Sequence, residues 1–438
     1  MPDARDAQIS RLPRALRPLS NPYYRLLTLG LSATLLGNGL WSVALVWQVI
    51  AMGDGPGQAA LVMTMFSVGL LASVLPAGVA ADRLPKLVVM RTSLWVQAGL
   101  VISAGALAVS GAVHIWHLAA VSFAFGIAEG FYIPAYTAFL PTILRPEELL
   151  GANGIEGVLR PGLQFALGPA IGAVLVALWS PGWAIVVQGA MFVIAAFVVG
   201  LIRPPRAVES EIDDSETSDS ESVLKDLLAG LQYMYRTRWF FASLLFAVGY
   251  VLAVVGPIEV LLPFVIRDIG GSPGHHATVL AVFGAAGAMG ALLVASRPLP
   301  RRYLTVMLAM WGLGSLPLAV IGYTDAVWMI AAVMVVVGAT GEAGQVIWGT
   351  LLQRRVPAEM LGRASSLDFF VSLVMMPASL ALAVPAAHLI GTTGVFIVAG
   401  VAPVVFAGVA HVTARLGRDE RDHRLDAPTR EGTACDEH

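Results

Sequence analysis

The sequence predicts an all-α polytopic membrane protein with twelve transmembrane helices, arranged as two six-helix bundles. The composition is the first reason: of 438 residues, 57% are hydrophobic and 13% are charged, and the mean hydropathy is +0.76. Twelve apolar stretches are the second, because a bilayer core needs about 20 apolar residues per helix. The third is that arginine-rich and arginine-poor connectors alternate between these stretches. This composition excludes a soluble globular protein.

The apolar stretches follow one another closely along the chain, separated by short polar connectors. We expect membrane spans at 25–52, 59–81, 88–111, 115–140, 154–179, 183–202, 238–266, 275–296, 303–322, 326–352, 364–388 and 393–414.

The arginines predict the sidedness of the protein. Arg11, Arg14 and Arg17 precede the first span, and the connector after that span has no basic residue. The alternation continues to the arginine-rich C-terminal tail, so the positive-inside rule places both termini in the cytoplasm. The N-terminus has no signal-peptide layout. We expect a multi-pass protein of a bacterial cytoplasmic membrane.

The chain divides into two halves. Seven acidic residues among serines between Arg203 and Ser222 cannot bury enough apolar surface to order themselves. The next stretch has leucines on one helical face and reads as an interfacial amphipathic helix, although it could simply begin the seventh span. We therefore expect a cytoplasmic N-tail (1–24), a bundle (25–202), a disordered acidic cytoplasmic linker (203–222), an interfacial helix (223–237), a second bundle (238–415) and a cytoplasmic C-tail (416–438).

The two halves resemble each other in sequence. Pro146-Glu-Glu-Leu-Leu-Gly151 follows the fourth span, and Pro357-Ala-Glu-Met-Leu-Gly362 follows the tenth. Glu156 and Asp368 come after these segments at nearly matching distances, five residues after Gly151 and six after Gly362. Duplicated halves are typical of transporters built from repeats.

A charged loop joins the second and third spans and carries a family resemblance. Gly78-Val-Ala-Ala-Asp82-Arg83-Leu-Pro-Lys86 resembles the Gly-x-x-x-Asp-Arg-x-Gly-Arg/Lys loop of the major facilitator superfamily, with Pro85 in place of a glycine. Together with the spans and the repeat, the resemblance covers about residues 20–415. It implies two bundles around a central cavity lined by the first, fourth, seventh and tenth spans.

The resemblance implies that this loop is a cytoplasmic gate. Asp82 would sit at the positive N-terminal end of the eleventh span, near Arg363. Arg83 and Lys86 would pair with acidic groups across the inner mouth, and Gly78 would let a neighbouring helix approach. The alternative is that these charges only mark the inner side of a short loop.

Two further segments point to a branch of the family. Phe131-Tyr-Ile-Pro-Ala135 and the residues after it look like the multidrug exporter branch that includes macrolide and siderophore exporters. Gly168-Pro169-Ala-Ile-Gly172 is similar to the antiporter motif of drug:proton exchangers, although Gln164 replaces its upstream glycine. Pro169 is expected to kink the fifth span. Ordinary close packing of small residues is the alternative explanation.

Five carboxylates lie within the predicted spans, where a charge is costly and marks a functional hypothesis. Burial away from water favours the neutral form of a carboxyl group, so a deeply placed group can exchange a proton as the cavity changes sides. Depth therefore favours Glu129 and Glu342 for proton coupling or substrate binding, with Glu259 third. Glu156 is expected to form an ion pair with Arg160 at the inner mouth. Asp368 would close that mouth from the other half.

Polar and aromatic residues on the same helix faces are candidates for the cavity lining. They are Asn38, Trp41, Gln48, Tyr132, Tyr136 and Gln345. A purely structural role, packing against lipid or within the bundle, is the alternative for the aromatic residues.

These features predict a proton-coupled exporter of amphipathic small molecules, working by antiport and alternating access. Export or flipping of an endogenous amphiphile, such as a lysophospholipid or siderophore, is the alternative, and a transport-dead sensor or scaffold is another. No metal-ligand spacing, nucleotide loop, catalytic triad or nucleic-acid stripe is seen, so we expect no enzyme, no metal, no cofactor besides protons and no nucleic acid. Substrate and membrane lipids are the expected partners of a monomer. His275 and His276 are expected to be solvated on an outer connector.

Overall fold

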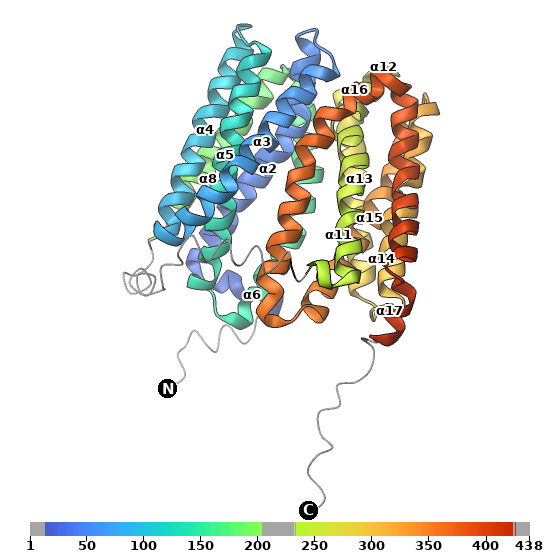
Figure 1. Ribbon diagram of the computed structural model, residues 1–438. Coiled ribbons are helices and arrows are strands. Elements are labelled where there is room, and N and C mark those ends of the chain that lie inside the picture. Colours follow the sequence, from blue (N-terminus) through green and yellow to red (C-terminus); the bar gives the residue numbers. More distant parts are fainter. Residues whose placement is uncertain (1–13, 204–231, 233, 424, 426–438) are drawn as a thin grey trace, which may run out of the picture.

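The computed structural model describes residues 14–203, 232, 234–423 and 425, and no strand occurs in that part of the chain. Figure 1 shows long helices standing side by side, and we call the face where α6 and α17 lie the terminal face. Eleven described segments are long and apolar enough to cross a membrane. The last of them, Val374–Thr413, has 40 residues and is long enough to cross twice. The predicted all-helical polytopic fold is confirmed.

The first half of the described chain contains six long helical stretches. Prolines occupy first-turn positions of many of these helices, where the missing N–H costs nothing, and the Asn21 side chain accepts the Tyr23 N–H at 2.9 Å to cap the first long helix. The elements are η1 (Arg14–Ser20), α2 (Pro22–Ala51), α3 (Pro56–Arg83), α4 (Lys86–Val109), α5 (Ile115–Ile143), α6 (Pro146–Leu159), η2 (Arg160–Leu167), α7 (Gly168–Leu178) and α8 (Pro181–Gly200).

The second half repeats this arrangement and ends in a short extra helix. The eleventh and twelfth predicted spans lie within one long helical element, interrupted at Gly391, where φ is +75°. The elements are α11 (Arg238–Gly256), η3 (Pro257–Leu261), α12 (Leu262–Asp268), α13 (Pro273–Ala295), α14 (Tyr303–Ser315), η4 (Leu316–Tyr323), α15 (Val327–Arg355), α16 (Ala358–Thr413) and α17 (Leu416–Asp422). The predicted acidic linker and most of the predicted interfacial helix lie outside the described residues.

Glycines set the closest helix crossing in each half. A Cβ added at Gly126 of α5 would lie 2.1 Å from the carbonyl oxygen of Phe66 on α3. A Cβ added at Gly290 of α13 would lie 2.0 Å from the carbonyl oxygen of Ala339 on α15. No side chain fits at such distances, so only glycine permits these backbones to touch. The second and fourth spans of one half thus pack as the second and fourth spans of the other do.

The two halves meet mainly along two pairs of spans. The fifth span, formed by η2 and α7, packs against α13, and α3 packs against α16. Phe165 of η2 and Phe283 of α13 form an edge-to-face pair with ring centroids 6.5 Å apart. The fifth span therefore belongs to one half and lines the boundary with the other.

Candidate transport site

Glu129 is an intramembrane carboxylate held by side-chain amides of its own half. It lies near the middle of α5, and its Oε2 accepts a hydrogen bond from the Gln97 Nε2 of α4 at 2.7 Å. Gln97 is fully buried, and the Asn38 side chain of α2 lies beside the same carboxylate. Three helices of the first half therefore converge on one acidic side chain, and side-chain amides supply the donors that an ionised carboxylate needs.

An ion pair lies on the fifth span beside this carboxylate. The Arg160 guanidinium donates to Glu156 Oε1 at 2.5 Å and to Gln164 Oε1 at 3.3 Å. The Tyr136 hydroxyl donates to the other Glu156 oxygen at 3.4 Å. Arg160 is also close enough to act electrostatically on Glu129. The ion pair expected from the spacing is present.

Most residues expected to line a cavity in the first half are packed inside it. Tyr132 and Tyr136 are 4% and 7% exposed and stack with centroids 6.0 Å apart. Gln48 is buried, and the half-buried Trp41 stacks on Phe125 at 6.3 Å. These side chains shape the bundle around Glu129 in this conformation, and their contact with substrate stays a prediction.

Glu342, the counterpart of Glu129 in the second half, has different surroundings. It lies on α15 with an exposed side chain, and no hydrogen bond joins it to another described residue. A Cβ added at Gly287 of α13 would lie 2.8 Å from the Glu342 Cγ, so the acidic side chain lies over that glycine. Gln345, one turn later, is also exposed. This carboxylate is accessible rather than enclosed by donors.

Asp368 is bonded within its own half. Its Oδ2 accepts the indole N–H of Trp348 on α15 at 3.0 Å. Trp348 in turn stacks face to face on Phe240 of α11, with centroids 5.9 Å apart and planes 5° apart. The second half thus holds its acidic group with an aromatic cluster where the first half uses an arginine.

Glu259 lies on a break in the seventh span. Residues Pro257–Leu261 form a π-helical turn, and the side chain of Glu259 is exposed. Ser379 of α16 repairs the break, because its hydroxyl accepts the Gly256 N–H at 2.8 Å and donates to the Leu252 carbonyl at 2.9 Å. Such π-helical turns are frequent at functional sites, and discontinuous helices carry the binding sites of many transporters.

The antiporter-like segment lies next to a second π-helical stretch. The helix leaves α geometry over η2, directly before Pro169, and the Gly168 N–H bonds to the Leu163 carbonyl, five residues earlier. A Cβ added at Gly168 would lie 2.7 Å from the Gly39 Cα of α2. Gly172 lies over Leu40 on the same face. These small residues bring the fifth span against the first, and an exchange role for them stays a prediction.

Most of the predicted gate loop is described only in its backbone. α3 ends at Arg83 and α4 begins at Lys86, so the charged loop is a two-residue connection. The Lys86 side chain is half-buried, whereas the side chains of Asp82, Arg83 and Arg363 and the surroundings of Gly78 lie outside what the structure describes. Their gating roles remain predictions.

Two polar residues were missed by reasoning from sequence. Gln97 is an amide in an otherwise apolar third span, and that contrast was the available signal. His276 was expected to be solvated, and this is wrong: it is 4% exposed at the end of the first turn of α13, and its Nδ1 has no partner within the described residues. The face of α13 that carries His276 packs inside the bundle, and the position of the residue near the end of a span did not reveal this.

The fold of two related halves and the buried polar groups point to a class, the polytopic transporters. Residues 27–379 match the Major Facilitator Superfamily, and the chain belongs to this family. The chain is a multi-pass protein of the bacterial plasma membrane type.

Individual relatives narrow this class. The chain is 24% identical to macrolide efflux protein A of Streptococcus pyogenes over 65% of this chain and 70% of that protein. It is 26% identical to the multidrug efflux pump Tap of Mycolicibacterium fortuitum over 86% of this chain and 91% of that protein. The crystal structure of a bacterial homologue of the human lysosomal transporter Spinster, in an inward-facing and unoccupied conformation, shares the fold with a TM-score of 0.66 at 17% identity, over 93% of this chain and 99% of that one. The predicted resemblance to drug exporters of this superfamily is confirmed.

Proposed function

We propose that this protein exports amphipathic small molecules across the cytoplasmic membrane in exchange for protons. The observation that supports the proposal most is the Glu129 carboxylate, held by Gln97 and Asn38 and influenced by Arg160. A carboxylate in the middle of a membrane span is costly, so its presence indicates a role in proton or substrate binding.

Protonation of Glu129 and binding of a cationic substrate would oppose each other, because the substrate binds the ionised carboxylate. When ionised, the carboxylate attracts Arg160 and the cationic part of an amphipathic substrate. Protonation removes both attractions, which weakens substrate binding on the side where protons are abundant. Only such a difference in affinity between two states can drive a conformational cycle.

The position of Arg160 suggests how the proton signal reaches the other half. Arg160 is the first residue of η2, whose π-helical turns pack against α13. Changing the charge of Glu129 alters the pull on Arg160 and on its partner Glu156. A shift at the start of η2 would move the boundary along which the two halves rock, which is the motion that alternating access requires.

Amphipathic drugs are the proposed substrates because the relatives named above are macrolide and multidrug efflux proteins. An aromatic and apolar environment with one carboxylate suits a molecule with a cationic amine on a large apolar body. An endogenous amphiphile of the same shape is the second candidate, and it is distinguished by the choice of test compound.

The test is substrate-triggered proton flux in proteoliposomes loaded with a pH-sensitive dye. A macrolide and an amphipathic cationic dye are added to wild type, to Glu129→Gln, and to Asp325→Asn, which changes an exposed carboxylate on a connector. We expect proton movement in wild type and Asp325→Asn and none in Glu129→Gln. Full proton-coupled efflux by Glu129→Gln would overturn the assignment. Movement of a fluorescent lysolipid, with no drug response in wild type, would favour the endogenous amphiphile.

A further inference from the structure

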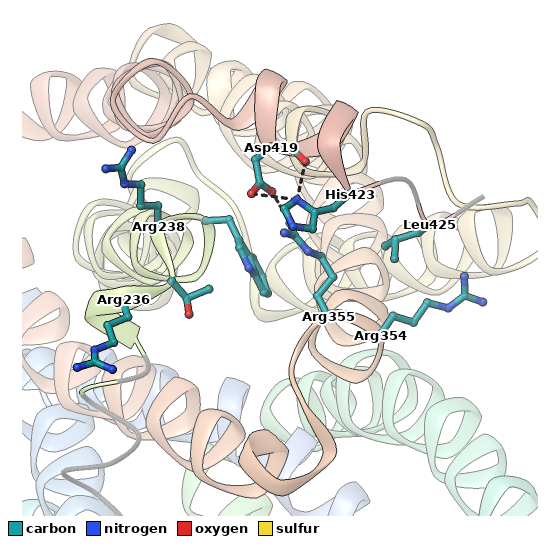
Figure 2. Close-up of a pocket in the computed structure, with 9 residues that line it drawn as sticks. Arg236, Arg238, Arg354, Arg355, Asp419, His423 and Leu425 are labelled. Carbon is teal, nitrogen blue, oxygen red and sulfur yellow. Dashed lines mark hydrogen bonds and ion pairs between the residues drawn. The ribbon is translucent and has the colours of Figure 1, made fainter. Parts of the chain in front are cut away.

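Two pockets at the terminal face share one arginine and have opposite character. The first has a volume of about 630 Å³ and is lined by Arg236, Arg238, Arg354 and Arg355, together with Thr237, Trp239, Asp419, His423 and Leu425. Figure 2 shows these side chains around the N-terminal end of α11, with Arg236 and Arg238 on one side and Arg354 and Arg355 on the other. Four arginines and one carboxylate line it, so the pocket carries excess positive charge, and only Arg355 approaches Asp419.

One of the four arginines, Arg355, already has partners and forms one wall of the pocket. Arg355 pairs with Asp419 of α17 at 2.5 Å and lies over the Trp239 ring, 4.6 Å from its centroid. Arg236, Arg238 and Arg354 are exposed and form no ion pair with the described residues. Thr237, at the N-cap of α11, makes no side-chain cap hydrogen bond. Three arginines without an ion-pair partner among the described residues, next to the uncapped N-terminus of α11, favour binding of an anion.

The second pocket is apolar and continues from the first into the membrane zone. It has a volume of about 700 Å³ between the start of α11 and the end of α16, and Arg238 is its only charged lining residue. Leu245 and Val409 on its walls are 59% and 55% exposed. From Arg238 to Gly249 the groove follows 11 residues of helix, about 16 Å at 1.5 Å per residue. That length matches about half of the bilayer core, which is one leaflet.

We propose that the two pockets are one binding site for an anionic phospholipid of the leaflet on the terminal face. The phosphate would contact Arg238, the arginine common to both pockets, with Arg236 and Arg354 adding positive charge around it. One acyl chain would lie in the groove between α11 and α16. Charge complementarity selects an anionic headgroup, and the apolar groove beginning at the same arginine selects a chain-bearing molecule over a soluble phosphate. The proposal is independent of the transport function, since Glu129 lies in the other half. Because Arg355 anchors α17 in the same pocket, a bound lipid would also brace the C-terminal helix.

The site is tested by native mass spectrometry of the full-length protein titrated with phosphatidylglycerol or phosphatidylcholine. Each arginine near a membrane surface contributes about 1 kcal/mol to anionic-lipid attraction, so removing two predicts about a tenfold to thirtyfold weaker binding of phosphatidylglycerol. The variant is Arg236→Gln/Arg238→Gln. The matched control is Arg297→Gln/Arg302→Gln, which removes two exposed arginines from a connector on the same face but outside the pocket. We expect the control to bind as wild type.

The groove is tested separately by filling it. Val409→Trp places a large ring in the groove, whereas Val412→Trp places it at a 72% exposed position of the same helix outside the groove. We expect Val409→Trp alone to weaken phosphatidylglycerol binding severalfold. Equal binding of both lipids by wild type would overturn the proposal. So would competition by glycerol phosphate at the affinity of the intact lipid, because it would show that the arginines bind a soluble phosphate compound.

Discussion

The two halves of this transporter share a helix crossing and differ in the chemistry built upon it. Gly126 in the first half and Gly290 in the second allow the same two helices of each repeat to touch. On that common frame the first half encloses Glu129 with amides and an arginine, while the second leaves Glu342 exposed and ties Asp368 to a tryptophan. The helix crossing is the same in both halves, and the donors to the acidic side chains differ: an amide binds Glu129 in the first, and an indole binds Asp368 in the second.

The shared crossing predicts the largest effect. Gly126→Val and Gly290→Val should each destabilise the protein by about 3 kcal/mol or more, because each new Cβ would meet a main-chain oxygen that cannot move aside. Thermal unfolding followed by fluorescence-detected size exclusion measures this. Gly99→Val and Gly349→Val are the matched controls, since a Cβ at either position meets nothing within 4 Å. Loss of stability in only one half would show that the crossing is not equivalent.

The carboxylates predict the next effect. Glu129→Gln should lower proton-coupled efflux by about 100-fold, the usual scale for losing a positioned proton-transfer group. Glu342→Gln should lower apparent affinity for cationic substrates and leave drug-triggered proton movement intact, because an exposed group without donors is placed to contact substrate. Initial rates in proteoliposomes at several substrate concentrations separate the two outcomes. Equal loss of coupling in both variants would mean that Glu129 and Glu342 both take part in proton transfer.

The donor to Glu129 can be tested without touching the carboxylate. Gln97→Leu removes the hydrogen bond to Oε2, and losing a bond to a charged group costs about 1.5–3 kcal/mol. We expect coupled efflux to fall by about tenfold or more and its pH profile to shift, which a merely structural role would not produce. Gln188→Leu is the control, because Gln188 is fully buried in α8 and its amide atoms have no partner within the described residues. An unchanged pH profile for Gln97→Leu would exclude a positioning role.

The sequence was a good guide to the spans and to short-range pairs. Hydropathy located the helices, and the spacing of Glu156 and Arg160 predicted their ion pair, because both signals depend only on local helix geometry. The partners of Glu129 could not be predicted, since Gln97 and Asn38 come from helices whose rotation only packing fixes. The π-helical turn under Glu259 was also missed, as its repair by Ser379 joins residues more than a hundred positions apart.

The smallest effect concerns the side-chain contacts of Glu156 in the first half and Asp368 in the second. The Arg160 side chain is 47% exposed, so solvent screens its pairing with Glu156. A double-mutant cycle with Glu156→Gln and Arg160→Gln should give a coupling energy below about 1 kcal/mol in thermal unfolding.

Trp348→Phe keeps the stacking on Phe240 but removes the only described donor to Asp368, and it should cost about 1 kcal/mol in the same assay. The hydrogen bond from Trp348 to Asp368 is therefore expected to contribute at least as much stability as the ion pair between Glu156 and Arg160. A coupling energy well above the cost of Trp348→Phe would reverse that order. Raised salt should increase the difference between the two energies. Screening weakens the Glu156–Arg160 pair and leaves the hydrogen bond from the Trp348 indole almost unchanged.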